Sequence, residues 1–236
     1  MRLDKFIADS AQVSRADARR VIQKGMVCVG GNVCRSADTQ VDGEVVTLNG
    51  KELSAQKFVY IMLDKPKGVV SASKDANDVT VIDLVKKDYP RRELFPAGRL
   101  DKQSTGFVLV TDDGGFAHDI LAPKRHVPKT YEVLLDTPVT DEMIKGFENG
   151  VTLADGELMH PAELLRMDDP CAATVVLRQG VYHQIKRMFG VYDAGVNELR
   201  RIAIGSLRLD ENLGAGGFRE ITLPEISSIF TKMTHF

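Results

Sequence analysis

Apolar residues near the start of the chain recur with the period of an α-helix. Two consecutive segments, residues 3–11 and 14–24, each place their apolar side chains on one arc of such a helix. The apolar positions are Leu3, Phe6, Ile7 and Ala11 in the first segment and Ala18, Val21 and Ile22 in the second. The pattern therefore predicts two short amphipathic helices, each with one face in a core.

The second of these helices has clear end signals and a cationic outer face. Ser14 is a natural N-cap, Asp17 stands at N3 near the positive end of the helix dipole, and Gly25 follows the last turn. The cationic residues lie opposite the apolar arc: Arg15, Arg19, Arg20 and Lys24. We expect only Asp17 to neutralise them. A solvated helix face and a surface for a phosphate backbone both fit this pattern.

Short strands and a polar segment follow the two helices. Residues 26–29 and 45–48 are short apolar runs with a glycine turn between them, which predicts strands. Residues 49–57 are polar and precede the strongly apolar run 58–63, so we place a linker there. The sequence therefore predicts a small domain at residues 1–57 and a larger domain at residues 58–236.

Strand-like runs outnumber helical patterns in the larger domain. The predicted strands are residues 58–63, 69–73, 106–111, 130–135, 173–178 and 219–223. The predicted helices are residues 80–87, 115–121, 141–150 and 183–189. Because their order does not alternate regularly as in βαβ units, we expect an α+β domain with a mixed, mostly antiparallel sheet.

Composition narrows the class of protein. The 236 residues are 43% hydrophobic and 27% charged, which is typical of a globular protein. No apolar run is long enough to span a bilayer, and charges occupy the N-terminus, so we expect a cytoplasmic protein. Cys28, Cys34 and Cys171 have no paired spacing and are expected to be reduced. The net charge is −2, but the first 58 residues hold nine Lys or Arg against seven Asp or Glu.

Several catalytic and cofactor motifs are missing from the sequence. Residues 43–52 have the wrong glycine spacing for a phosphate-binding loop, and residues 214–218 lack the full dinucleotide fingerprint. The histidines are scattered without metal-ligand spacing, and no GxSxG elbow is present. We therefore expect neither a nucleotide cofactor, nor a metal, nor a serine nucleophile.

The remaining candidate for chemistry is Asp101, in a loop that leads into the predicted strand at 106–111. Read alone, an aspartate between Arg99 and Lys102 fits a loop ion pair as well as a catalytic group. In residues 183–192 the apolar side chains form one helical stripe, and His183, Lys186 and Arg187 lie on the opposite arc. These cations are expected to point away from the core.

Four segments of the larger domain together resemble a known family. They are "LDKPKGVVSA" (63–72), "GRLDKQSTGFVLVTDDG" (98–114), "KTYEV" (129–133) and "GVYHQIKRMF" (180–189). The chain resembles the RsuA-type pseudouridine synthases, which convert uridine to pseudouridine in ribosomal RNA, and its first 50 residues resemble the S4 RNA-binding domain. Lys186 within "YHQIKRMF" favours a small-subunit enzyme that acts on 16S rRNA at uridine 516, over one that acts on 23S rRNA.

The resemblance implies roles for single residues. Asp101 would be the catalytic carboxylate, Lys186 its partner, and Tyr131 the surface on which the extruded uracil stacks and a group for proton transfer at C5. Arg99 would fill the space left by the flipped base or contact phosphate. The remaining RNA contacts would be Arg187, His183, Lys67 and the basic helix with Arg15, Arg19, Arg20 and Lys24. No cofactor and no metal are implied.

A second class of function shares the basic helix but lacks the chemistry. An S4-type RNA-binding or ribosome-assembly protein would use the same cations, but a carboxylate at Asp101 would only repel its RNA. A synthase requires that carboxylate. We expect ribosomal RNA, as 16S rRNA in a small-subunit assembly intermediate, to be the partner of a monomeric protein with no membrane contact. Whether the carboxylate attacks C1′ or removes the C2′ proton stays open.

Overall fold

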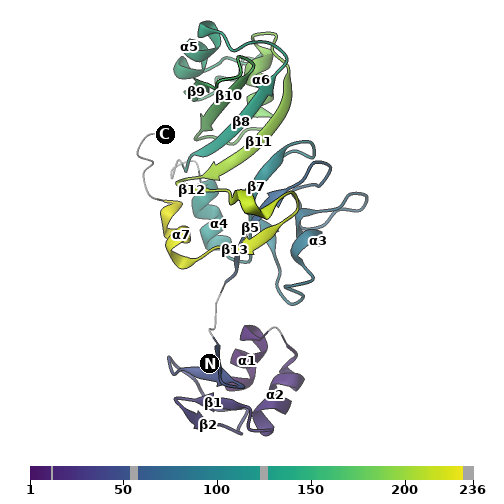
Figure 1. Cartoon of the computed structure of the whole chain (residues 1–236), viewed down its shortest axis with the longest axis vertical. Coiled ribbons are helices and arrows are strands. Elements are labelled where there is room, and N and C mark those ends of the chain that lie inside the picture. Colours follow the sequence, from purple (N-terminus) through teal and green to yellow (C-terminus); the bar gives the residue numbers. More distant parts are fainter. Residues whose placement is uncertain (12, 54–57, 123–126, 231–236) are drawn as a thin grey trace. The chain divides into compact units, whose positions relative to one another are not determined.

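The computed structural model describes residues 1–11, 13–53, 58–122 and 127–230 (Figure 1). The chain divides into two compact units, one of residues 1–58 and 88–92, the other of residues 59–87 and 93–236. Each unit has an apolar core of its own. Every helix in the described ranges is too short or too polar to cross a lipid bilayer.

The smaller unit combines two helices with an antiparallel sheet. Helix α1 spans Leu3–Ser10 and α2 spans Arg15–Gln23, and their apolar faces pack into one core. The sheet has the order β2-β1-β3-β4. Its strands are β1 (Val27–Val29), β2 (Asn32–Val33), β3 (Val46–Leu48) and β4 (Lys51–Leu53). Both predicted helices and both predicted strands are confirmed.

The predicted ends of α2 are confirmed, whereas the predicted linker is partly wrong. The Ser14 hydroxyl accepts a hydrogen bond from the amide of Asp17 at 2.9 Å, and Gly25 has a φ of +74° after the last turn. Strand β4 lies inside the segment 49–57 that its polar composition marks as a linker. It is an edge strand with exposed side chains, which suits polar residues. Residues 54–57 lie outside the described residues.

Asp4 changes the electrostatics expected for the cationic helix. Its buried carboxylate accepts hydrogen bonds from Arg15 at 2.7 Å, from Arg19 at 3.0 Å and from Arg2 at 3.2 Å. The hydrogen bond from Arg15, and next that from Arg2, hold the pKa of Asp4 far below its usual range. The expectation that only Asp17 neutralises this face is therefore wrong, because α1 packs Asp4 against a helix that follows it in the sequence.

The larger unit is built on a nine-stranded sheet. Seven of its strands follow the order β13-β5-β7-β11-β8-β10-β9, and the other two pair beside them, β6 with β7 and β12 with β11. Its strands are β5 (Tyr60–Lys65), β6 (Phe95–Pro96), β7 (Thr105–Thr111), β8 (Lys129–Leu135), β9 (Glu163–Arg166), β10 (Ala172–Leu177), β11 (Val196–Ile204), β12 (Leu207–Arg208) and β13 (Phe218–Glu220). Strands β7 and β11 run parallel, and the other described pairs are antiparallel. The predicted α+β class is confirmed.

Helices cover the two ends of this sheet. They are α3 (Val81–Val85), α4 (Gly114–Leu121), α5 (Asp141–Asn149), α6 (Gln184–Gly190) and α7 (Leu223–Ser228), with a 3₁₀ turn, η2, at Glu211–Leu213. In Figure 1, α5 and α6 gather with β8 to β10 at one end of the unit, and α4 and α7 lie near β12 and β13 at the other. One apolar core lies at each end. The four predicted helices are confirmed.

Two strand predictions in the larger unit are wrong or partly wrong. Residues 69–73 form no strand beyond a single bridge between Val70 and Thr80. The Ser71 hydroxyl bonds instead to the backbone of Leu100, so this segment serves a loop rather than the sheet. In 219–223 the strand ends at Glu220, since Thr222 begins α7 with a capping box.

Strand β11 lies at the centre of the sheet although its sequence does not predict a strand. The segment "VNELRRIAI" carries consecutive charges in a position where an apolar alternation is expected. Two of these charges have partners in the fold: Arg200 forms a bidentate ion pair with Asp64 of β5, and Arg201 donates to backbone carbonyls. Long-range pairing therefore places a polar sequence in a central strand.

Candidate active site

Asp101 lies in a loop between β6 and β7 whose backbone is fixed by the segment that follows β5. The Ser71 hydroxyl donates to the carbonyl of Leu100 at 2.9 Å and accepts from its amide at 3.0 Å. The amide of Gly68 donates to the carbonyl of Lys102 at 2.8 Å. These bonds hold the residues on both sides of Asp101. The segment after β5 therefore positions the carboxylate.

A buried lysine, Lys65, also holds the backbone of this loop. The ammonium of Lys65, at the end of β5, donates to the carbonyls of Ser104 at 2.7 Å, Pro66 at 3.1 Å and Lys102 at 3.3 Å. Burial lowers the pKa of Lys65 to about 8, and the negative charge of Asp101 acts in the opposite direction. Because three carbonyls share this one donor, the loop depends on it for its backbone hydrogen bonds.

Replacing Lys65 with methionine should destabilise the larger unit by about 2–4 kcal/mol. The methionine fills much of the same volume but removes the ammonium from the carbonyls of Ser104 and Pro66, whereas that of Lys102 keeps the amide of Gly68. Each buried group left unsatisfied costs roughly 1–3 kcal/mol. Urea denaturation followed by circular dichroism measures the loss. Lys67→Met is the matched control, since Lys67 is exposed and two residues away, and it should change stability by less than ~0.5 kcal/mol. Equal effects for the two variants would contradict the support given by Lys65.

Helix α6 and the residue directly before it each present a side chain to Asp101. The Nε2 atom of His183 lies 3.3 Å from Oδ1 of Asp101, and the Nζ atom of Lys186 lies 3.8 Å from Oδ2. On the opposite side of the helix, Ile185 and Phe189 are buried in the core. The stripe predicted for this helix is thus confirmed. About a third of each polar side chain is exposed, so the carboxylate is held in place but open to an approaching ligand.

His183, which is expected to line an RNA path, also lies beside Asp101. Its ring nitrogen is closer to the Asp101 carboxylate than the ammonium of Lys186 is. Its backbone has a φ of +50°, in the left-handed region, directly before α6. Non-glycine residues in this region are uncommon and are enriched at functional sites. The turn before the helix therefore serves to direct His183 at Asp101.

Tyr131 lies on β8, two strands away from the strand that carries the Asp101 loop. It pairs with Arg201 of β11, and Arg201 pairs with Gly106 of β7, so the three residues form one row across the sheet. Adjacent strands are about 4.8 Å apart, which puts Tyr131 about 10 Å from β7 along this row. Its half-buried ring packs against the core that contains Ile185 of α6. Packing against this core thus places Tyr131 on the side of the sheet covered by α6.

Arg201 is a supporting residue that the sequence patterns do not reveal. It is almost fully buried, and its Nε donates to the carbonyl of Phe107 at 2.7 Å while a terminal nitrogen lies 3.4 Å from the carbonyl of Gly98. These carbonyls lie on the two sides of the Asp101 loop. Gly106 has a φ of +98°, and a side chain there would lie 2.3 Å from the backbone oxygen of Arg201. The close approach of β7 and β11 therefore fixes both ends of the loop.

Three further predicted site residues lie on the surface of the larger unit. Arg99 and Lys67 are exposed, next to the loop and to the turn that holds it. Arg187, one turn along α6 from His183, forms ion pairs with Asp155 and with Glu157. Arg187 is therefore directed toward these carboxylates and not toward Asp101.

The sequence leaves open whether Asp101 forms an ion pair with its neighbours Arg99 and Lys102. In the structure, Lys102 and Asp101 each have a partner elsewhere. Lys102 pairs with Asp78 at 2.7 Å. Within the described residues, Asp101 faces His183, directly before α6, and Lys186 in α6, both more than 80 positions later in the sequence. Such a long-range pair cannot be deduced from the neighbours of Asp101.

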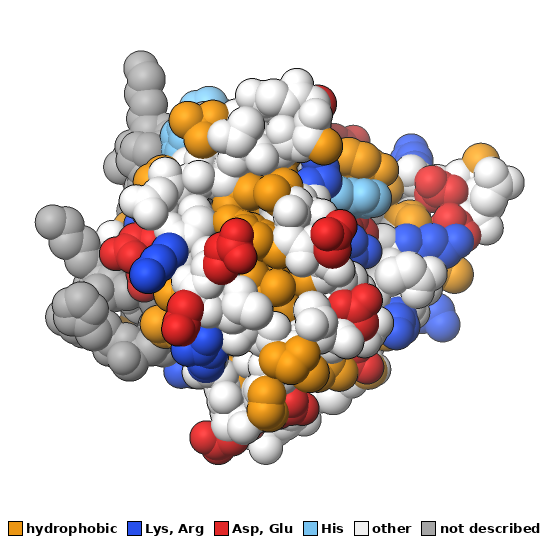
Figure 2. Space-filling model, turned by 90° about the horizontal axis from the view of Figure 1, so that it is seen from above, with side chains coloured by type: hydrophobic (Ala, Val, Ile, Leu, Met, Phe, Trp, Pro, Cys, Tyr) orange, Lys and Arg blue, Asp and Glu red, His pale blue; other side chains and the backbone are white. Residues whose placement is uncertain are grey.

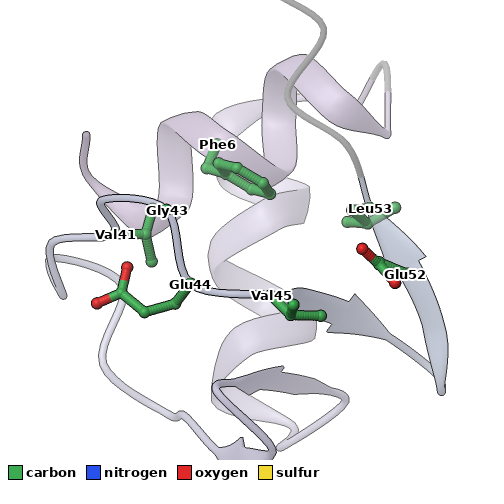
Figure 3. Close-up of a pocket in the computed structure, with 7 residues that line it drawn as sticks. All are labelled: Phe6, Val41, Gly43, Glu44, Val45, Glu52 and Leu53. Atoms are coloured by element: carbon green, nitrogen blue, oxygen red, sulfur yellow. The ribbon is translucent and has the colours of Figure 1, made fainter.

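A cavity in the smaller unit has the wrong charge for RNA. It has a volume of about 310 Å³ and is lined by Phe6, Val41, Gly43, Glu44, Val45, Glu52 and Leu53 (Figure 3). Two carboxylates at its rim would repel a phosphate backbone. The cationic side of α2 is the better candidate for contact with nucleic acid.

A carboxylate faces a histidine and a lysine at the start of α6, in a chain that also carries a small unit with a basic helix, and this combination fits an enzyme that acts on RNA. Residues 59–190 match the family model described as RNA pseudouridylate synthase, and residues 1–46 match that of the S4 domain. The chain belongs to the RNA pseudouridylate synthase family and is an RNA pseudouridine synthase, as the resemblance in its sequence predicts.

Named relatives match along nearly the whole chain. The ribosomal small subunit pseudouridine synthase A of Escherichia coli is 39% identical over 231 residues, which cover 97% of this chain and 100% of that protein. An uncharacterized RNA pseudouridine synthase, YtzG, of Bacillus subtilis is 39% identical over 96% of this chain and 97% of its own length. A crystal structure of a pseudouridylate synthase matches with a TM-score of 0.69 and 34% identity, covering 97% of this chain and 99% of the other.

Proposed function

We propose that this enzyme isomerises a uridine of ribosomal RNA, specifically uridine 516 of 16S rRNA, with Asp101 as the catalytic carboxylate. The observation that carries the proposal is the geometry of Asp101, whose two oxygens face His183 and Lys186 on a loop with a fixed backbone. The names of relatives that act on the small ribosomal subunit support the choice of 16S rRNA.

The isomerisation breaks the N-glycosidic bond, rotates the uracil and joins its C5 atom to C1′ of the ribose. The C5 proton leaves and a proton is gained at N1, so nothing else enters or leaves the nucleotide. An aspartate is ionised at neutral pH, so Asp101 can attack C1′ or remove the C2′ proton. The partial exposure of its carboxylate leaves room for the ribose. Neither route requires a cofactor or a metal.

The positions of the other site residues support the roles that the family resemblance implies. Lys186 stabilises the negative charge of Asp101 at close range. Tyr131 stacks on the extruded uracil and exchanges the proton at C5, since its ring lies on the α6 side of the sheet. Exposed Arg99 fills the space of the flipped base or contacts phosphate. Lys67 and Arg187 contribute RNA contacts at the rim.

The cellular setting follows from the substrate. A uridine inside folded RNA has to be flipped out, which is easier before the RNA is fully packed. We therefore place the reaction on 16S rRNA in a small-subunit assembly intermediate, in the cytoplasm. We also propose that the enzyme acts as a monomer.

Mapping the product tests the target. The purified enzyme is incubated with 16S and with 23S rRNA, and pseudouridine is located by carbodiimide modification and reverse transcription. We expect a single product at uridine 516 of 16S rRNA, and its loss from the ribosomes of a deletion strain. A product in 23S rRNA alone would assign the enzyme to the large subunit. Product in neither RNA, with the deletion strain unchanged, would overturn the proposal.

The basic side of α2 should account for part of the RNA affinity. We expect a variant in which glutamine replaces these four cations to have a smaller slope of log Kd against log salt concentration. The slope should fall by up to about four, which is about one for each phosphate that no longer meets a cation. Arg15 and Arg19 share Asp4, and Arg20 pairs with Asp17 at 3.1 Å, but each side chain is at least half exposed and can still reach phosphate. Filter binding at several salt concentrations measures the slope. An unchanged slope would mean that this face is only solvated.

A further inference from the structure

Tyr182 is a large aromatic residue left in solvent beside the proposed catalytic group. It is 70% exposed and immediately precedes His183 at the start of α6. Its ring stacks on the imidazole of His183, with ring centroids 3.9 Å apart and an angle of 16° between the planes. One face of the tyrosine is therefore covered by His183. Its high exposed fraction leaves the opposite face to solvent.

The turn that carries Tyr182 is held by its neighbours. The buried side chain of Gln184 accepts a hydrogen bond from the amide of Val181 at 3.2 Å, and the amide of Gln184 donates to the carbonyl of Val181 at 3.2 Å. The amide of Arg187 bonds to the carbonyl of His183 at 2.9 Å. Tyr182 thus stands in a turn with both ends fixed, so little conformational entropy is lost when a ligand stacks on it.

The stack is directly connected to the carboxylate. The same His183 ring that supports Tyr182 approaches Oδ1 of Asp101 to 3.3 Å. His183 therefore contacts Asp101 through Nε2 and Tyr182 through its ring face, so only one side chain separates Tyr182 from the proposed place of the reacting ribose. The part of an RNA strand one step away from that ribose is the nucleotide next to the target. The open ring provides a flat apolar surface and no positive charge.

We propose that Tyr182, supported by His183, is a stacking platform for the base of a nucleotide adjacent to the target uridine. Flipping the uridine removes a stacking partner from its neighbours, and an aromatic ring can replace it for any base. Charges of both signs are interspersed on the end of the large unit shown in Figure 2, so this end is not a uniform phosphate-binding surface. The inference rests on the proposed role of Asp101, which places the target.

Kinetics with an RNA fragment that contains the mapped target test the platform. Tyr182→Leu removes the ring but keeps an apolar side chain, and it should raise KM about tenfold while kcat stays within about twofold. Tyr182→Phe, which keeps the ring, should restore KM to within about threefold of the original enzyme. Leu223→Ala is the control, because Leu223 is also 70% exposed but lies on α7. A normal KM for Tyr182→Leu, or a loss confined to kcat, would overturn the platform.

Photocrosslinking locates the base independently of turnover. 5-Iodouridine is placed singly on either side of the target, and the crosslinked peptide is identified by mass spectrometry. We expect a crosslink to Tyr182 from one of the two positions, and its loss in Tyr182→Leu. The experiment is repeated in Asp101→Asn, so a wrong role for Asp101 shows as retained activity while the crosslink still reports on Tyr182. Crosslinks from both positions that avoid Tyr182 would overturn the inference.

Discussion

Replacing Asp101 with asparagine should reduce pseudouridine formation at least about a thousandfold, with little change in RNA affinity or stability. Asparagine keeps the size of the side chain but can neither attack C1′ nor remove the C2′ proton. The loop itself is held by Ser71 and Lys65 through its backbone, so it keeps its conformation without the charge. Release of tritium from RNA labelled at C5 of uridine measures the reaction, and filter binding measures the affinity.

Asp78→Asn is a matched control for this experiment. Asp78 is also partly exposed and also forms an ion pair close to the loop, with Lys102 at 2.7 Å. Its replacement removes one negative charge at the same end of the unit and should change the rate by less than about threefold. Full tritium release by Asp101→Asn would exclude Asp101 as the catalytic group. A similar loss in both variants would show that net charge, and not the position of Asp101, determines the rate.

Helices and strands with a regular apolar pattern could be predicted from the sequence, whereas the central strand β11 could not. The end signals at Ser14 and Gly25 and the alternation in β8 predict their elements because local packing and capping determine them. Strand β11 escapes prediction because its charged residues gain their partners from distant strands, as Arg200 does from Asp64. The same reason applies to Asp4, whose ion pairs exist only once α1 packs on α2.

In the candidate site too, some features are visible in the sequence and others arise only from tertiary contacts. The motif around Asp101 identifies a carboxylate with unusual neighbours, and the stripe in α6 indicates which side chains face outward. The contact between the two comes from tertiary structure alone, since it joins a loop to a helix more than 80 residues later. Arg201 and Lys65 support the loop through buried hydrogen bonds to backbone carbonyls, which no pattern of side chains can reveal. Sequence thus indicates the candidate carboxylate better than the residues that hold its loop.

Replacing Lys186 with methionine should lower kcat roughly a hundredfold and change RNA affinity by less than about threefold. The ammonium lies 3.8 Å from Oδ2 of Asp101, and in the proposed reaction it stabilises the charge of that carboxylate. It is one positive charge among many that can contact RNA, so its loss costs little binding. His183 stays within 3.3 Å of Oδ1 and keeps Asp101 in place, so the effect is electrostatic and not a loss of the loop. Single-turnover kinetics separate the chemical step from binding.

Lys186→Arg distinguishes charge from shape at this position. Arginine keeps the positive charge within reach of Asp101, so we expect it to recover at least about a tenth of the original kcat. Lys87→Met is the control for a lost surface charge, since Lys87 is exposed and is not among the proposed RNA contacts. If Lys186→Met weakened RNA binding and left kcat intact, Lys186 would be an RNA contact. His183 would then be the one side chain of the two that supports Asp101 in the reaction.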